Sequence, residues 1–337
     1  MNMLFIVIIY NLVQNVLCYN HSYRFIEWFQ KFKIKVNSND HFIHIFNNWL
    51  KNDQIIKNHD NKYYILGHNE YSGMNSSEFS EYNKFKNNRD LYKSLQSNQY
   101  YTNNYSYRSL SNISNSIDWR KHNVLSPIQN QGNCGSCWSF SGIATLESTI
   151  AIKTGKLVKL SEQQGIDCAK GSKYQNLGCQ GGMYYNLWNY ARDHNGLCTE
   201  ESYPYKGVDG VCEENKCNYY RGSRDNSFTQ VRPNDDIELI KALNKQPVSI
   251  AIEADQYQFQ LYKSGIFTNK CGNNLDHAVV LVGYGTDDNT NTNYYILRNS
   301  WGRSWGEDGY MRILKDGSLN DGSGQCGLLS IPMYPNL

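Results

Sequence analysis

The fold is decided by residues Gln131–Phe140, which read QGNCGSCWSF. Apolar residues follow at near-helical spacing up to Gly155, which predicts a helix that starts close to Cys137, with Ser136 as a candidate cap. The partial positive charge at a helix start lowers the pKa of a thiol, and the thiolate is the form that attacks a carbonyl carbon. The stretch therefore indicates a cysteine nucleophile.

The pair Cys134 and Cys137 is also compatible with a redox dithiol or with half of a zinc site. A thioredoxin-like dithiol follows a strand of a βαβ unit, whereas residues 123–130 are short, polar and contain a proline. A zinc site needs a second close pair of ligands, and the next cysteines, Cys168 and Cys179, are far apart. Both alternatives fit the sequence less well than a nucleophile does.

The composition is that of a soluble protein without a strongly charged partner. The 337 residues allow one large or two modest domains, 40% of them are hydrophobic, and the formal net charge is +2. The 33 Lys and Arg residues are scattered and are not interleaved with aromatic residues as in a nucleic-acid-binding surface. We therefore expect no nucleic-acid partner, and the sequence indicates no metal ion and no cofactor.

The N-terminus predicts entry into the secretory pathway. Residues 1–18 contain an apolar run, interrupted by Asn11, Gln14 and Asn15, which is too short and broken to form a stable membrane anchor. A cleaved signal peptide fits this pattern. An uncleaved anchor remains the alternative, because no charged side chain precedes the apolar run.

The cysteine count agrees with that route. Of the ten cysteines, eight remain when Cys18 in the signal and the nucleophile Cys137 are set aside. An even number can pair completely, as expected in an oxidising compartment, although spacing alone does not give the connectivity. We expect a secreted protein or one of a lysosome- or vacuole-like compartment. Candidate glycosylation sites of the form Asn-x-Ser begin at Asn20, Asn75, Asn104 and Asn112.

Residues 19–112 are expected to form a helical leader that ends in a linker. Apolar residues recur at helical spacing over residues 23–59, with a polar break at residues 37–40, which predicts two amphipathic helices. Residues 94–116 are rich in Asn, Ser and Tyr and lack periodicity, as in an exposed, cleavable linker. The predicted units are therefore a signal peptide at 1–18, a leader with linker at 19–112 and a main domain at 113–337.

The main domain changes character along its length. Its first hundred residues favour helix and loop, and Ser161 and Gln164 have the spacing of a capping box. A short predicted helix at 236–245 then precedes several strand-like runs. A mostly helical lobe before a mostly β lobe defines an α+β fold, and the cleft between two lobes is a usual place for a site. The strand-like runs are residues 248–254, 278–282, 294–297 and 310–314.

The second lobe supplies what a thiolate nucleophile needs, which is a general base and a group that orients the base. His277 opens one predicted strand, Asn299 closes the next, and a polar turn joins the two strands. In an antiparallel hairpin the start of the first strand lies opposite the end of the second, so the two side chains are expected to be neighbours. Trp301 follows closely, and its indole can cover the hydrogen bond between them and exclude water.

Further motifs follow the decapeptide in order. They are Ser161-Glu162-Gln163, Gly178-Cys179-Gln180-Gly181-Gly182, Tyr203-Pro204-Tyr205, Asp276-His277-Ala278, Gly283-Tyr284-Gly285 and Asn299-Ser300-Trp301-Gly302-Arg303-Ser304-Trp305-Gly306. From residue 113 to the C-terminus, the chain thereby resembles the papain-like cysteine peptidases of the cathepsin L type. The resemblance implies a two-lobed fold with a helical N-terminal lobe and a β-barrel-like C-terminal lobe, preceded by a helical inhibitory propeptide. It also implies an endopeptidase that is made as a zymogen.

The resemblance assigns catalytic roles residue by residue. Cys137 becomes the nucleophile, His277 the general base and acid, and Asn299 the partner that orients His277. Gln131 and the backbone N–H of Cys137 become the donors to the oxyanion, an effect worth roughly 3 kcal/mol per donor.

The resemblance also implies contacts with substrate and a set of disulfides. The pocket for the second residue before the scissile bond contains no acid, so we expect Leu, Phe or Val there rather than Arg. The positions implied for substrate binding are Gly181, Gly182, Met183, Tyr184, Ala251, Leu275, Asp276, Trp301 and Ile331. The pairs implied for disulfides are Cys134 with Cys179, Cys168 with Cys212 and Cys271 with Cys326, and Cys198 and Cys217 are then paired by elimination.

The leader resembles the family's inhibitory propeptide with some departures. Phe42 stands where the family has an Arg, and Gly73 stands where it has an acid that is linked to acid-triggered release. The implied partners are protein and peptide substrates, the chain's own propeptide and cystatin-type inhibitors, and a monomer is expected. The alternative from another class is a catalytically silent binding or storage protein on the same fold. Such proteins usually lose the nucleophile or the base, and this chain retains Cys137 and His277.

Overall fold

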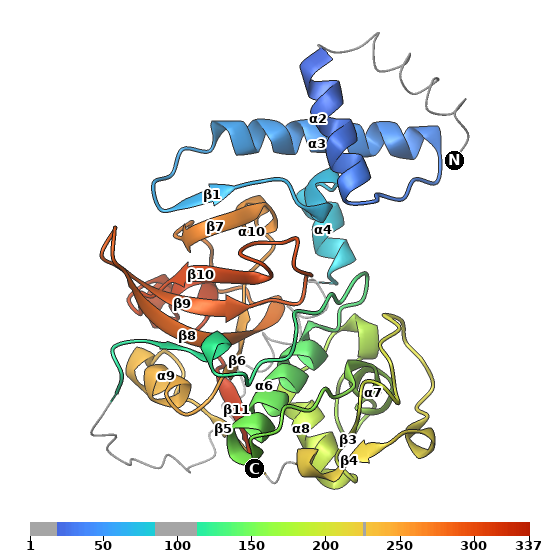
Figure 1. Cartoon of the computed structure of the whole chain (residues 1–337), viewed down its shortest axis with the longest axis vertical. Helices are drawn as coiled ribbons and strands as arrows, with labels where there is room; N and C mark the ends of the chain where they lie inside the picture. Colours follow the sequence, from blue (N-terminus) through green and yellow to red (C-terminus); the bar gives the residue numbers. More distant parts are fainter. Residues whose placement is uncertain (1–18, 85–112, 225–226) are drawn as a thin grey trace.

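The computed structural model describes residues 19–84, 113–224 and 227–337. These residues form a leader, a helical lobe and a β lobe (Figure 1). The predicted signal peptide and most of the predicted linker lie outside the described residues. The same holds for the Asn-x-Ser sites at Asn104 and Asn112 and for the side chain of Asn20.

The leader is built on the two predicted helices, which cross each other in the structure (Figure 1). They are α2 (Tyr19–Lys31) and α3 (Asn39–Asn58) (Figure 1). Ser38 caps α3 by accepting a hydrogen bond from the backbone N–H of His41. Their facing sides bury aromatic residues, among them Phe25 and Trp49, each of which stabilises such a core by roughly 1.5–3 kcal/mol. The rest of the leader consists of β1 (Tyr64–Leu66), η1 (Glu70–Gly73) and α4 (Ser76–Tyr82).

The helical lobe is organised around α6 (Cys137–Thr154), which begins at the predicted residue and ends at Gly155 in the left-handed region (φ 72°). Ser136 occupies the N-cap position, but its side chain makes no capping hydrogen bond, so that part of the prediction is wrong. The hydroxyl of Ser136 instead contacts Cys134 and Tyr205. The other elements of this lobe are α7 (Glu162–Cys168), η3 (Gly178–Gln180), α8 (Tyr184–Asp193), β3 (Leu197–Cys198), η4 (Glu214–Lys216), β4 (Tyr219–Tyr220) and η5 (Arg221–Ser223).

The predicted capping box at α7 is half present. The side chain of Ser161 accepts a hydrogen bond from the backbone N–H of Gln164. The side chain of Gln164 does not return to Ser161, because its oxygen accepts from the backbone N–H of Cys198 on the neighbouring β3. A tertiary contact has therefore replaced the local one.

The β lobe contains most of the described strands. Within the described ranges, nine strands form one sheet in the order β1-β7-β10-β9-β8-β6-β11-β5, with β2 paired to β8. The central pair β8–β9 is the hairpin that the sequence predicts. The elements are β2 (Ile117–Asp118), η2 (Trp119–Lys121), β5 (Ser227–Gln230), α9 (Asp236–Leu243), β6 (Val248–Ile252), α10 (Tyr257–Gln260), β7 (Tyr262–Phe267), β8 (His277–Asp287), β9 (Thr292–Arg298), β10 (Tyr310–Leu314), η6 (Asn320–Gly322), η7 (Gln325–Gly327) and β11 (Met333–Asn336).

The leader docks on the β lobe by adding a strand to the edge of its sheet. Strand β1 pairs antiparallel with β7, and Tyr64 lies opposite Gly265. Gly265 has a φ of 96°, and a Cβ at this position would lie 2.3 Å from the backbone oxygen of Tyr63, so only glycine allows the two strands to approach.

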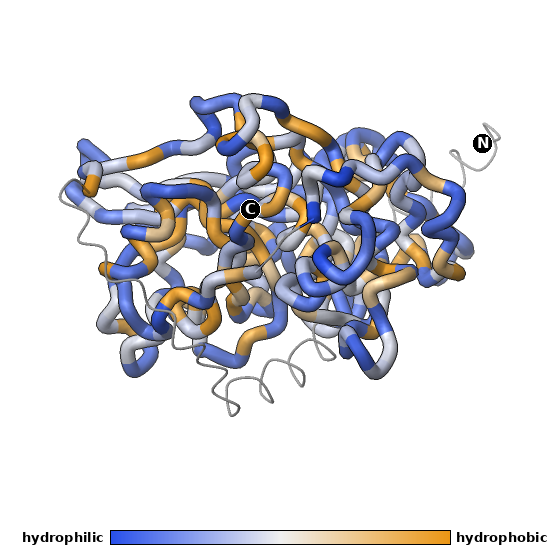
Figure 2. The backbone as a smooth tube through the Cα atoms, turned by 90° about the horizontal axis from the view of Figure 1, so that it is seen from below, coloured by the Kyte–Doolittle hydropathy of each residue, from blue (hydrophilic) through white to orange (hydrophobic). Residues whose placement is uncertain are grey.

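Apolar segments lie mostly inside and polar loops at the periphery (Figure 2). Among the described residues, no helix combines the length and apolarity needed to cross a membrane.

Candidate active site

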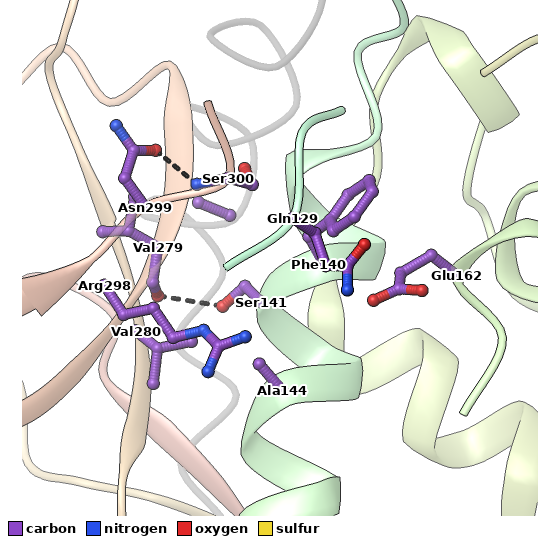
Figure 3. Close-up of a pocket in the computed structure, with 11 residues that line it drawn as sticks. Gln129, Phe140, Ser141, Ala144, Glu162, Val279, Val280, Arg298, Asn299 and Ser300 are labelled. Carbon is purple, nitrogen blue, oxygen red and sulfur yellow. Dashed lines mark hydrogen bonds between the residues drawn. The ribbon is translucent and has the colours of Figure 1, made fainter. Parts of the chain in front are cut away.

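The site lies where the start of α6 meets the start of β8. Cys137 is the first residue of α6, is fully buried and takes part in none of the disulfides among the described residues. One turn further along α6, the hydroxyl of Ser141 donates to the carbonyl oxygen of Val279 at 2.9 Å (Figure 3). Val279 is two residues after His277, so this bond joins the helix that carries the thiol to the strand that carries the imidazole.

The hairpin brings His277 and Asn299 together as predicted. The distance between His277 Nε2 and Asn299 Oδ1 is 2.8 Å, and both side chains are buried. Asn299 Oδ1 also accepts from the backbone N–H of Ser300 at 2.8 Å (Figure 3), which orients the amide with its oxygen towards the histidine. A carbonyl oxygen can only accept, so Nε2 carries the proton and Nδ1 is the basic nitrogen of the neutral ring.

Trp301 covers this hydrogen bond. Its ring stacks on His277 with a centroid separation of 4.6 Å and an interplanar angle of 20°, and it is fully buried. Burial lowers the pKa of His277 to about 4, and the hydrogen bond to Asn299 opposes part of that shift. In this closed form the imidazole is therefore neutral at neutral pH.

Gln131 is held between the two lobes. Its backbone N–H donates to the carbonyl oxygen of Ser300 at 2.8 Å, and its side-chain oxygen accepts from the Ser300 hydroxyl at 2.7 Å. Its side-chain nitrogen donates to the carbonyl oxygen of Cys134 at 3.0 Å. The sequence analysis names Ser300 only within a motif and predicts no role for it. The position of Ser300 directly after Asn299 is the signal that could have identified this contact.

The structure places the predicted substrate-binding residues in different surroundings. Gly182 lies against Trp138, because a Cβ on Gly182 would be 2.7 Å from the indole ring. The carboxylate of Asp276 accepts from the backbone N–H of Ala254 at 2.8 Å, which gives Asp276 a structural contact. The apolar positions share one buried cluster with Cys137, and they are Met183, Tyr184, Ala251, Leu275 and Ile331.

A small polar cavity lies behind the site, between the lobes. Its volume is about 20 Å³, which is enough for one water molecule. Figure 3 shows Arg298 and Asn299 on its β side and Ser141 on α6, with Glu162 on the far side. Burial raises the pKa of Glu162, against the opposing effect of Lys159, with which it forms an ion pair at 2.5 Å.

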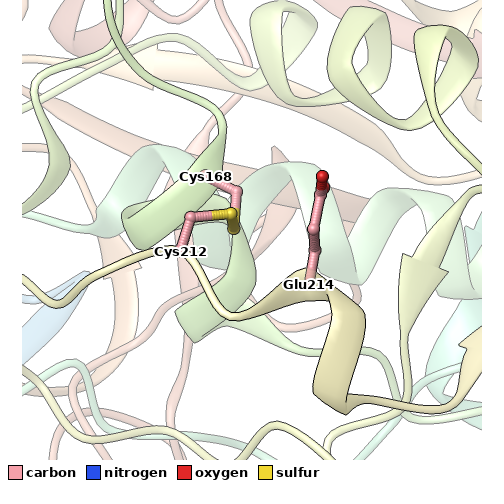
Figure 4. Close-up of side chains that lie close together, drawn as sticks. All are labelled: Cys168, Cys212 and Glu214. Carbon is pink, nitrogen blue, oxygen red and sulfur yellow. A yellow bond between two sulfur atoms is a disulfide. The ribbon is translucent and has the colours of Figure 1, made fainter.

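The described residues contain four disulfides, and these join the same cysteines that the resemblance and elimination paired. Two of these cysteines, Cys168 and Cys212, lie beside Glu214, and the potential ligand atoms of the three residues lie within 4.8 Å of one another (Figure 4). The two sulfurs are bonded to each other, so they offer no thiolate to a metal ion. The pairs are Cys134–Cys179, Cys168–Cys212, Cys198–Cys217 and Cys271–Cys326.

The leader touches both sides of the site. Phe79 of α4 packs edge-to-face on Trp301 at a centroid separation of 5.1 Å. Lys84 lies against the loop before Cys137, because a Cβ on Gly135 would be 2.5 Å from the Lys84 Cβ. The carboxylate of Glu70 accepts from the Ser304 hydroxyl at 2.9 Å. Access to Trp301 and to the Gly135 loop therefore requires the leader to move.

The combination of a two-lobed fold, a thiol at a helix start and a buried His–Asn pair matches a known family. Residues 113–336 match the model of the papain family cysteine protease, which is more than half of the chain. The chain belongs to the papain family of cysteine proteases, as the motifs predict.

Two curated relatives show the extent of the likeness. The chain is 44% identical to the oryzain beta chain of Oryza sativa subsp. japonica over 231 residues, which cover 68% of this chain and 48% of that relative. It therefore spans about half the length of that protein. It is 37% identical to the senescence-specific cysteine protease SAG12 of Arabidopsis thaliana over 321 residues, which cover 93% of this chain and 90% of that relative.

Solved proforms match the leader as well as the main domain. The proform of the Amb a 11 cysteine protease, a major ragweed pollen allergen, matches with a TM-score of 0.83 and 30% identity over 94% of both chains. A recombinant stem bromelain precursor matches with a TM-score of 0.79 and 32% identity, over 94% of this chain and 99% of that one. The predicted papain-like fold with a leading propeptide is thus confirmed.

Proposed function

We propose that the chain is the zymogen of a cysteine endopeptidase in which Cys137 is the nucleophile. The observation that carries this proposal is the buried hydrogen bond between His277 Nε2 and Asn299 Oδ1, on a strand tied to the helix that starts at Cys137. This bond leaves Nδ1 of His277 available for the proposed proton exchange with the thiol. The geometry and the family membership support the proposed roles of Cys137, His277, Asn299 and Gln131.

Acylation transfers one proton and breaks one bond. The Cys137 thiol gives its proton to His277 Nδ1, and the thiolate attacks the carbonyl carbon of the peptide bond. The electron pair of the carbonyl moves to its oxygen, which the Cys137 backbone N–H and the Gln131 amide stabilise. When the carbon–nitrogen bond breaks, His277 gives the proton to the leaving amine, and a thioester remains.

Deacylation reverses these roles for water. His277 removes a proton from a water molecule that attacks the thioester carbon, and the second tetrahedral intermediate uses the same oxyanion donors. The carbon–sulfur bond then breaks, the carboxylic acid leaves, and Cys137 takes back the proton. Trp301 covers the His277–Asn299 bond throughout, which keeps water from competing for it.

The test is labelling of the mature protein with a peptidyl epoxide at mildly acid pH. We expect covalent labelling and peptide hydrolysis in the wild-type enzyme and neither in Cys137→Ala. Labelling or hydrolysis that survives the substitution would refute the mechanism.

The apolar cluster around Met183, Leu275 and Ile331 supports a preference for Leu, Phe or Val at the second residue before the scissile bond. A buried Arg side chain in such a pocket would lack a partner for its charge. Paired fluorogenic peptides that differ only at this residue test the preference. A higher kcat/KM for Arg than for Leu would contradict it.

The leader acts in this proposal as an intramolecular inhibitor, supported by its contacts with Trp301 and the Gly135 loop. The four disulfides agree with folding in an oxidising compartment, and we infer a lysosome- or vacuole-like compartment or the cell exterior. Protein and peptide substrates and cystatin-type inhibitors are the proposed partners of a monomeric enzyme. The exposed Asn75 is a candidate glycosylation site within the described residues.

A further inference from the structure

Two tyrosines of one short motif bond to different parts of the helical lobe. The Tyr203 hydroxyl donates to the Asp167 carboxylate at 2.9 Å. Asp167 is not part of the Gln131–Phe140 stretch. The Tyr205 hydroxyl donates to the backbone oxygen of Gln131 at 2.6 Å and lies 2.8 Å from the Ser136 hydroxyl. The single hydrogen of Tyr205 is used by the Gln131 carbonyl. At the 2.8 Å contact Ser136 is therefore the donor whenever its own single hydrogen is not directed to the Cys134 carbonyl at 3.3 Å.

The two partners of the Tyr205 hydroxyl belong to the two halves of the oxyanion hole. Gln131 carries the side-chain amide, and Ser136 is bonded directly to the nitrogen of Cys137, whose N–H is the second donor. One phenol oxygen therefore connects the two backbone segments from which both oxyanion donors project. The bond from Gln131 to Cys134 and the Cys134–Cys179 disulfide hold the middle of this loop, and Tyr205 holds its two ends.

Tyr205 is itself held from several sides. Its backbone N–H donates to the Glu200 carboxylate at 2.8 Å. Its ring meets Phe140 edge-to-face at a centroid separation of 4.9 Å and packs against the cluster of Cys134, Ile166 and Cys179. Burial raises the pKa of Tyr205 well above its usual range, so the phenol stays protonated and able to donate.

We propose that Tyr205 is a positioning residue whose hydroxyl fixes the separation of the Gln131 amide from the Cys137 backbone N–H. This inference rests on the proposed function, and it concerns the oxyanion and not the thiol. Oxyanion donors lower the barrier because they are oriented before charge develops on the oxygen. If the Gln131 amide and the Cys137 backbone N–H are less well positioned, they stabilise the transition state less, while binding of the substrate changes little. The loss therefore appears in kcat and not in KM.

The test compares Tyr205→Phe with its matched control Tyr203→Phe in the mature enzyme. Each variant loses one hydroxyl from the same motif and keeps the ring. We expect Tyr205→Phe to lower kcat by roughly 10-fold with KM unchanged, which is less than the loss of a whole oxyanion donor. Tyr203→Phe is expected to keep kcat within about twofold of the wild type. A kcat of Tyr205→Phe equal to that of Tyr203→Phe overturns the proposal.

A second pair of measurements separates positioning from general damage. A peptide aldehyde forms a bond between its carbonyl carbon and the Cys137 sulfur, the carbonyl electron pair moves to oxygen, and that oxygen takes the thiol proton and lies between the oxyanion donors. A peptidyl epoxide is opened by the same thiolate at a ring carbon and forms no oxyanion from a peptide carbonyl. We expect Tyr205→Phe to weaken aldehyde binding about as much as it lowers kcat, with the rate of epoxide labelling unchanged. A parallel loss of labelling contradicts the proposal.

Ser136→Ala provides the test if Tyr205→Phe does not yield folded enzyme. It removes the other hydroxyl of the contact and is expected to lower kcat and aldehyde affinity in the same ratio, with epoxide labelling unchanged. Failure of the proposed function is distinguishable, because it appears as hydrolysis that survives Cys137→Ala. Failure of this inference leaves hydrolysis dependent on Cys137 but insensitive to both hydroxyls.

Discussion

At the scale of single residues, the proposed chemistry depends on how His277 is oriented and on the exclusion of water around it. The Asn299 oxygen accepts from both His277 Nε2 and the backbone N–H of Ser300, so the amide cannot turn without losing two hydrogen bonds. Trp301 stacks on the imidazole and shields this bond from water. The ring is thereby held in the tautomer that leaves Nδ1 basic.

Asn299→Ala removes the group that orients the imidazole. We expect kcat/KM to fall by about 100-fold, the lower end of what general acid–base catalysis contributes, since the ring can rotate and exchange its tautomer. Kinetics of the mature enzyme on one fluorogenic peptide measures the loss. Asn299→Asp keeps an oxygen acceptor and is the matched control for shape. An Asn299→Ala enzyme with wild-type kcat/KM would show that Asn299 has no orienting role.

The protonation of His277 can be measured directly in the Cys137→Ala proform. An unfolded histidine has a pKa near 6.5, whereas burial lowers that of folded His277 to about 4. Below about pH 6.5 the unfolded chain therefore binds more protons than the folded chain, and acid reduces folding stability through this residue. NMR titration of His277 is expected to give a pKa well below 6.5, and a value at or above 6.5 contradicts the prediction.

At the scale of elements, the leader contains a charged cluster where its helices meet the segment after β1. Asp53 of α3 is fully buried and pairs with Arg24 of α2 at 2.7 Å, with Lys57 at 2.7 Å and with His68 Nε2 at 3.1 Å. Burial opposes its ionisation, but hydrogen bonds from Lys57, Arg24 and the His68 ring outweigh that effect and hold the pKa of Asp53 at about 2. The His68 ring also stacks on Trp49 at 4.5 Å.

Gly73 stands in the position of the family's acid, and the structure leaves no room there for a larger residue. A Cβ on Gly73 would lie 2.8 Å from Ile45 and 2.9 Å from Trp28. The amides of Asn48 and Asn52 bond to backbone oxygens of this segment. A titratable group of the leader, His68, meets the buried Asp53 instead.

Protonation of His68 is expected to loosen the leader in acid. Burial lowers the pKa of His68, with Arg24 and Lys57 adding to the effect and Asp53 opposing it. Below about pH 6.5, where an unfolded histidine takes up a proton, the folded leader loses stability, because a third cation would face one carboxylate.

His68→Phe keeps a ring against Trp49 but cannot take up a proton. We expect conversion of the zymogen to the mature enzyme to need a lower pH, by roughly half a unit. Conversion followed on gels across a pH series measures this shift. His41→Gln, at the start of α3, is the control and should convert like the wild type. An unshifted profile for His68→Phe contradicts the prediction.

At the scale of the whole molecule, the leader and the two lobes share one set of contacts around Trp301. The core of the β lobe includes Phe79 and Tyr71 from the leader together with Trp301 and Trp305. The Tyr71 hydroxyl also donates to the backbone oxygen of Trp301 at 3.4 Å. Trp301, which stacks on His277, is thus also an anchor point for the leader.

Phe79→Ala should weaken this anchor and leave the mature enzyme intact. Loss of a buried phenylalanine costs about 3 kcal/mol or more, which is expected to speed zymogen conversion at a given pH. The kcat and KM of the mature product should be those of the wild type, because the leader is then absent. Ser76→Ala, at an exposed position of the same helix that leaves the Asn75 sequon intact, is the control. Equal conversion rates of the two variants would contradict the prediction.

Much of the fold could be predicted because its signals are local. The helix from Cys137 to Gly155 follows from apolar spacing and a terminal glycine, and the hairpin from two strand-like runs around a polar turn. The neighbourhood of His277 and Asn299 was predictable for the same reason, since antiparallel pairing relates strand ends by simple geometry.

What the sequence by itself determined is therefore the set of elements, the helix start at Cys137 and the His–Asn pair. Only the tertiary structure decided that Ser300 holds the Gln131 amide, that the Tyr205 hydroxyl contacts both Gln131 and Ser136, and that His68 meets a buried Asp53. These partners come from separate elements. The position of a hydroxyl or carboxylate group in the sequence does not predict which distant residue it will bond to. Their hydrogen bonds form only when the lobes and the leader have packed, because packing fixes the distances and directions on which a hydrogen bond depends.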